Sequence, residues 1–140
     1  RVLRRGGVCI FNVWDRIETN EFTDCVQRGV EAVFPVDTPR FLPDVPHGYF
    51  DHARIAADLA RAGFPQAPLI TVVAKRSRAP SPRHPAIGFC QGSPLRNQIE
   101  ARDGARLAEV VEAATAAVAK RFGEGAIEAG IKAHVVQIAR

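Results

Sequence analysis

Methionine is absent from this chain of 140 residues, and aromatic side chains make up only 7% of it, with one Trp and one Tyr. Translation starts with methionine, and Arg1 is too large for routine removal of the initiator. We therefore expect a fragment of a longer protein or a cleavage product. No apolar run approaches the roughly 18 to 20 residues that span a membrane, and no signal-peptide pattern begins the chain. These absences predict a cytoplasmic protein without membrane contact.

The chain also has few cysteines and a small net charge. Three cysteines, an odd number, favour reduced thiols over a disulfide framework. The net charge of +4 is too small to indicate a nucleic-acid partner. Four basic residues gather at 75–83, where contact with RNA or phosphate is the rival interpretation, but no aromatic residue is interleaved with them. Together with three prolines they predict a solvated, flexible connector at 75–85.

The size and the 46% hydrophobic content fit one globular domain, residues 1–140. Residues 8–13 form an unbroken apolar run, which is typical of a strand buried on both faces by helices. Further strands are predicted at 69–74 and 131–138. Capping residues and apolar periodicity predict three longer helices, which begin after Asn20, Asp51 and Asp103. Shorter helices are expected at 86–90 and 95–101, so the fold class is α/β.

Two groups of polar and aromatic residues are candidates for a binding site. Asn12, Trp14 and Asp15 follow the first strand, and ligands of α/β sheets bind at the carboxyl ends of strands. The alternative is that Trp14 packs in the core and Asp15 serves a turn. His47 and Tyr49 lie in a proline-rich loop that is suited to cover a substrate or move a proton, unless His47 only bonds to the local backbone.

A metal site is not expected. The remaining histidines, His52, His84 and His134, show no ligand spacing with each other or with the cysteines. Glycine-rich phosphate-binding motifs are missing as well. The sequence therefore predicts a small-molecule site without a metal ion or nucleotide loop.

Several short motifs occur in the order found in one known family. The chain resembles the C-terminal half of class I S-adenosylmethionine (SAM)-dependent methyltransferases, especially the small-molecule type related to ubiquinone and menaquinone biosynthesis enzymes. The usual proline before the glycines of the first motif is Arg5 here. The motifs are VLRRGGV (2–8), NVWD (12–15), PHGY (46–49), DLARAGF (58–64) and CQGSPLR (90–96).

The resemblance implies a partial Rossmann-like sheet of three strands, the family's strands five, seven and six, with flanking helices. The last strand would lie antiparallel between the other two. The implied function is to bind a small methyl acceptor, with Asn12, Trp14, Asp15, His47 and Tyr49 as substrate-binding residues. His47 and Tyr49 would also be the catalytic residues.

The family holds its cofactor, SAM, with segments that this chain does not contain. We therefore expect no cofactor-binding residue here, no SAM bound to the chain alone, and no activity without the missing half. A noncatalytic ligand-binding or protein-association domain is the alternative. The first strand would lose its neighbour in such a half, and an apolar sheet edge of this kind favours a homo-oligomer.

Overall fold

The computed structural model describes residues 3–140, so Val2 of the first motif lies outside the described residues. Three strands form one sheet, β1 (Val8–Trp14), β2 (Leu69–Ala79) and β3 (Ile127–Ala139). Their order is β1-β3-β2, and β3 is antiparallel to both neighbours. The last strand therefore lies between the other two, as expected. The class is mixed α/β.

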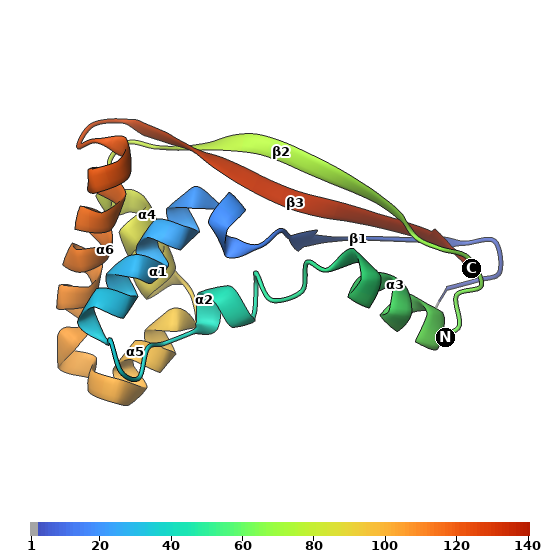
Figure 1. Ribbon diagram of the computed structural model, residues 1–140, viewed down its shortest axis with the longest axis horizontal. Helices are drawn as coiled ribbons and strands as arrows, with labels where there is room; N and C mark the ends of the chain where they lie inside the picture. The colour runs from blue at the N-terminus through green and yellow to red at the C-terminus, as the bar shows by residue number, and fades with distance from the viewer. Residues whose placement is uncertain (1–2) are drawn as a thin grey trace.

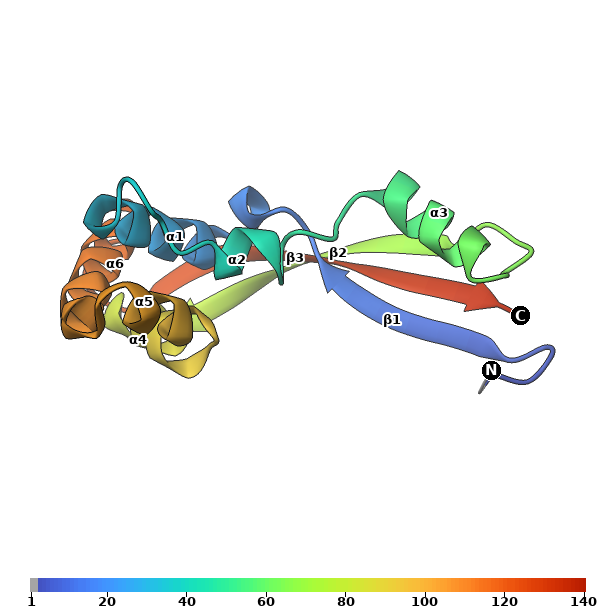
Figure 2. The same ribbon diagram turned by 90° about the horizontal axis from the view of Figure 1, so that it is seen from below.

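Most helices gather at one end of this sheet (Figures 1 and 2). This helical end comprises α1 (Glu21–Val33), α2 (Phe41–Asp44), α4 (Arg83–Gly92), α5 (Leu95–Asp103) and α6 (Leu107–Phe122). Its core includes Val26, Val30, Val110, Val111 and Val118, which are all fully or almost fully buried. α3 (His52–Arg61) lies apart from them, along the other half of the sheet. Two 3₁₀ turns, Ile17–Thr19 and Gly104–Arg106, lead into α1 and α6.

The long central strand β3 buries opposite faces at its two ends. Ile127 and Ala129 belong to the core of the helical end, whereas Val136 and Ile138, which have the opposite parity along the strand, are buried in the other half. Successive side chains of a strand point to opposite faces. The sheet is therefore covered on one face near α1 and α6, and on the other face where α3 lies.

The helices follow the sequence pattern closely. The carboxylate of Asp51 accepts hydrogen bonds from the backbone N–H groups of Ala53 and Arg54, at 2.7 and 3.0 Å, so it caps α3 as expected. Asp103 caps the 3₁₀ turn that leads into α6, through the N–H of Ala105. α1 spans the periodic apolar residues after Asn20 and crosses α6 closely. A Cβ on Gly29 of α1 would lie 2.4 Å from the backbone of α6.

The prediction that residues 8–13 are buried on both faces is wrong. β1 is an edge strand that pairs only with β3 among the described residues, and its exposure alternates along its length. Val8 and Ile10 are 47% and 63% exposed. An apolar run without alternation therefore belongs here to a strand with one covered and one open face.

The predicted connector at 75–85 is also wrong. Residues 75–79 continue β2, and α4 begins at Arg83, so only the short segment 80–82 links the two elements. Arg76 and Arg78 are two residues apart on the strand and therefore share one face of the sheet, and both make ion pairs with Glu128 of the neighbouring strand. Strand pairing thus orders a segment whose composition is typical of a loop.

Within residues 3–140, no helix combines the length and the apolar character needed to cross a membrane.

Candidate functional site

Asp15 is the centre of a buried polar cluster at the carboxyl end of β1. Its side chain is almost entirely buried, and its Oδ1 accepts a hydrogen bond of 2.8 Å from the backbone N–H of Arg16. Nζ of Lys132 lies 3.8 Å from Oδ2, and Nε2 of His134 lies 3.4 Å from Oδ1. Burial alone would raise the pKa of Asp15, but the hydrogen bonds and these neighbouring charges outweigh it and lower the pKa. Asp15 is therefore a carboxylate at neutral pH.

A second histidine extends this cluster toward the surface. Nε2 of His52 lies 2.8 Å from Nδ1 of His134, and the two rings meet edge to face with centroids 4.5 Å apart. A proton on Nε2 of His134 faces the carboxylate of Asp15, which leaves Nδ1 of the same ring as an acceptor for the N–H of His52. The three side chains form a chain from α3 across β3 to the end of β1.

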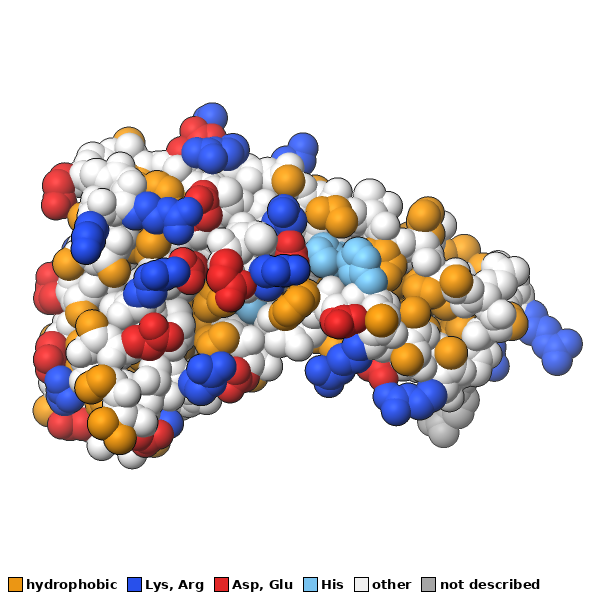
Figure 3. Space-filling view, in the orientation of Figure 1, with side chains coloured by type: hydrophobic (Ala, Val, Ile, Leu, Met, Phe, Trp, Pro, Cys, Tyr) orange, Lys and Arg blue, Asp and Glu red, His pale blue; other side chains and the backbone are white. Residues whose placement is uncertain are grey.

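The cluster borders a cavity of about 410 Å³. The exposed His52 and the buried Asp15 and His134 line it, and Phe50 and Val72 supply apolar wall. Arg16, whose guanidinium lies over the ring of Phe50 at 5.6 Å, and Lys132 add positive charge. Figure 3 shows histidine side chains at the surface near the middle of the molecule, beside charged side chains.

Asn20 fixes the backbone on which the cluster is built. Its side-chain amide donates to the carbonyl oxygens of Asp15, Arg16 and Lys132, each at 3.2 Å, and its Oδ1 accepts the N–H of Lys132 at 3.1 Å. The amide thus continues the pairing of β3 beyond the last residue of β1. Asn20 was expected to cap α1 with its side chain, but it makes no such bond, because its amide is held by β3.

His47 lies against the same stretch of backbone. Its ring is buried, and Nδ1 lies 2.8 Å from the carbonyl oxygen of Asp15, so this nitrogen carries the donated proton. Burial lowers the pKa of His47, although the Asp15 carbonyl, the Asp15 carboxylate and Glu18 act in the opposite direction. The ring centroid lies 6.4 Å from that of Trp14. A neutral His47 therefore links the proline-rich loop to the end of β1.

The structure brings together three of the five predicted site residues, namely Trp14, Asp15 and His47. Asn12 is exposed on β1, two residues from Trp14, and no side-chain hydrogen bond ties it to the cluster. The hydroxyl of Tyr49 donates to Asp58 of α3 at 2.9 Å, and burial and this carboxylate raise the pKa of Tyr49. Tyr49 therefore fastens the loop to α3.

Sequence reasoning missed His52, His134 and Lys132. His52 and His134 are 82 residues apart, so no local spacing links them. The available signals were weak: His52 follows a helix cap, and His134 is a polar residue on the buried side of an alternating apolar strand. Pairing of β3 with β1 and the position of α3 bring them together.

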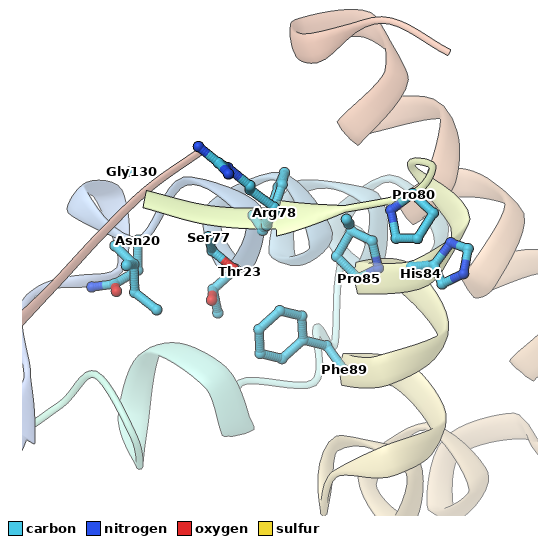
Figure 4. Close-up of a pocket in the computed structure, with 12 residues that line it drawn as sticks. Asn20, Thr23, Ser77, Arg78, Pro80, His84, Pro85, Phe89 and Gly130 are labelled. Atoms are coloured by element: carbon cyan, nitrogen blue, oxygen red, sulfur yellow. The ribbon is translucent and has the colours of Figure 1, made fainter. Parts of the chain in front are cut away.

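A second cavity of about 360 Å³ lies between the helical end and the sheet (Figure 4). Phe22, Pro85 and Phe89 give it apolar walls, and Thr23 and Ser77 contribute hydroxyl groups. Asn20, whose amide bonds to the backbone of Asp15, lines this second cavity, so the cavity neighbours the histidine–aspartate cluster. Arg78 and His84 also line it, so its walls are apolar only in part.

In the part of the chain that the structure describes, no group of three or more His, Cys, Asp or Glu residues is placed to hold a metal ion. No family model matches the sequence, and no curated protein matches it.

Proposed function

We propose that this chain is the acceptor-binding half of a SAM-dependent methyltransferase that acts on a small molecule. The observation that carries the proposal is the position of the Asp15 cluster and its cavity. They lie at the carboxyl end of β1 and at the N-terminus of α3, and in the parallel sheets of the family that the sequence resembles ligands bind at the carboxyl ends of strands. A cavity of about 410 Å³ is in the size range of small-molecule sites.

The strand arrangement supports the same proposal. In the family that the sequence resembles, the last strand lies antiparallel between its two predecessors, and β3 has this place between β1 and β2. We assign β1, β3 and β2 to the family's strands five, seven and six. Of the five residues predicted to bind the acceptor, Asp15 lines this cavity, and Trp14 and His47 lie beside it at the end of β1. Asn12 and Tyr49 lie outside the cluster, and we expect them to have weaker effects on turnover.

The described residues do not fit the cofactor SAM. The family binds it with a glycine-rich loop after one strand and an acidic residue that ends the next. Here β1 leads through Asp15 into a 3₁₀ turn, and β2 leads into Pro80. We therefore assign no residue of this chain to SAM, and within this proposal another segment must supply that site.

The proposal is tested by comparing two proteins in calorimetric titrations with SAM. The 140-residue chain should not bind at micromolar concentration. The protein expressed with the coding sequence that precedes Arg1 should bind one SAM per chain and should transfer its methyl group. Micromolar binding by the 140-residue chain, or failure of the extended protein to bind SAM, would contradict the proposal.

A second candidate function, association with another copy of the chain, is favoured by the open face of the sheet. The register places Ile10 and Leu69 on either side of Gln137, and both are 63% exposed. Val8 and Trp14 share that face of β1, whose outer edge carries no partner strand among residues 3–140. Apolar strand edges of this kind pair with other chains.

Light scattering over a range of concentrations tests this association. The parent chain should show a homodimer or a larger homo-oligomer, and Ile10→Lys should shift it to monomer. The control is Val36→Lys, which changes a residue that is 97% exposed and lies outside the sheet. A parent chain that is monomeric at every concentration would contradict the candidate.

A further inference from the structure

We propose that His52, His134 and Asp15 form a proton relay in which His52 is the general base, and that the molecule it serves carries an acidic hydroxyl group, such as a phenol or an enol. This inference rests on the proposed function for its reaction, because methyl transfer to oxygen is the step that needs the hydroxyl deprotonated. Its geometric part stands on this chain alone.

The relay has a direction because its members differ in exposure. All three side chains line the cavity, but Asp15 and His134 are buried, whereas His52 is exposed. His52 is therefore the most accessible member for a molecule that enters from solvent. Asp15 and His134 are therefore positioning residues. They lie behind the base, His52, and fix its tautomer and orientation. This is the general logic of a base oriented by a third group.

The arrangement of the three side chains assigns the nitrogen that reacts. Nε2 of His134 lies 3.4 Å from the carboxylate of Asp15, which favours a proton on that nitrogen. Nδ1 of His134 then accepts a hydrogen bond from the N–H at Nε2 of His52, at 2.8 Å. Nδ1 of His52 is left with a free lone pair, since no described residue donates to it. That lone pair is the site at which a proton can be accepted.

The class of acceptor follows from matching the base to the acid. A phenol or an enol is a much stronger acid than an aliphatic alcohol, so a positioned imidazole base deprotonates it far more readily. Lys132 and Arg16 line the same cavity and supply positive charge for the oxyanion. Phe50 and Val72 offer apolar wall for an aromatic or unsaturated ring.

The proton step balances within the site. The O–H bond of the bound molecule breaks, its proton forms an N–H bond at Nδ1 of His52, and the electron pair stays on oxygen. His52 becomes an imidazolium that is stabilised through His134 by the negative charge of Asp15. The proton leaves to water from the exposed ring, and the oxyanion is the nucleophile that accepts a methyl group.

The first test needs no activity and uses the 140-residue chain. Long-range ¹H–¹⁵N spectra of the imidazole rings report which nitrogen carries the proton. We expect the neutral ring of His134 to carry its proton on Nε2 and not on Nδ1, and we expect Asp15→Asn to lose this preference. His134 protonated at Nδ1 in the parent chain, or a tautomer that Asp15→Asn leaves unchanged, would overturn the relay.

The second test uses the extended protein with a set of phenolic and aliphatic hydroxyl compounds as acceptors. His52→Gln should reduce kcat for phenols by about 100-fold or more, the usual contribution of a general base. Binding of SAM should be unchanged. His84→Gln, on an exposed histidine of α4 that bonds to Ser81, is the control and should retain activity.

The outcomes separate the two proposals. An extended protein that does not bind SAM contradicts the proposed function, while the tautomer measurement still decides the relay. An extended protein that methylates phenols equally well with and without His52 overturns the relay and leaves the proposed function standing. Faster transfer to aliphatic alcohols than to phenols would overturn the acceptor class.

Discussion

Replacing Asn20 with alanine should destabilise the protein more than its loop position suggests. Asn20 is 3% exposed, and its amide joins the exit of β1 to the middle of β3. In Asn20→Ala the N–H of Lys132 loses its acceptor, and the carbonyl oxygens that share the amide lose a donor.

The magnitude follows from those groups. An unsatisfied buried N–H costs about 1–3 kcal/mol, and each net hydrogen bond contributes about 1 kcal/mol. We expect Asn20→Ala to lower the free energy of unfolding by about 2–4 kcal/mol. Asn20→Asp should be at least as harmful at neutral pH, because it places a second oxygen against the carbonyls of Asp15 and Arg16.

Urea unfolding followed by circular dichroism measures both variants. The matched control is Asn12→Ala, which removes the same side chain from an exposed position on β1 and should change the free energy of unfolding by less than about 0.5 kcal/mol. If Asn20→Ala and Asn12→Ala have equal free energies of unfolding, the hydrogen bonds of Asn20 between β1 and β3 do not stabilise the fold.

Three further results are expected. Gly29→Ala should destabilise by about 1–3 kcal/mol, because its Cβ would meet the backbone of α6 at 2.4 Å. In contrast, Gly88→Ala, with open space around its Cβ, should stabilise α4 slightly in thermal melts. Burial lowers the pKa of His47, so the folded state binds fewer protons there than the unfolded state. Stability should therefore fall as the pH drops below about 6.5, and His47→Gln should flatten that slope in urea titrations. Burial raises the pKa of Cys90 to about 11, so a thiol reagent should modify the partly exposed Cys9 first and Cys90 only on unfolding. Equal rates for the two thiols would contradict this.

Local patterns predicted the helices well. The periodicity of α1 and the cap at Asp51 depend on residues that are near one another in the chain, so the sequence contains the whole signal. The burial of β1 was misjudged because an apolar run looks the same whether or not a helix covers its second face. β2 was predicted too short because the basic residues and serine of its second half are typical of a loop. They hide the strand pattern, in which Arg76 and Arg78 share one face.

The candidate site was predictable only in part. Asp15 and His47 were found because each lies in a segment with a recognisable local role, the end of a strand and a proline-rich loop. His52 and His134 form their contact through tertiary structure, across 82 residues of sequence. Without an expected distance between them, two isolated histidines carry no spacing signal.

The central place of β3 also governs the order in which the chain can fold. β1 and β2 pair with β3 and not with each other, and Val8 meets Ala139, 131 residues later. Contacts of such long range close slowly. During synthesis β1 therefore cannot pair with β3 until β3, the last of the described strands, has been made, and the edge that β3 will cover is open to wrong pairing for that interval. A truncation that removes β3 would leave two strands with no sheet to join.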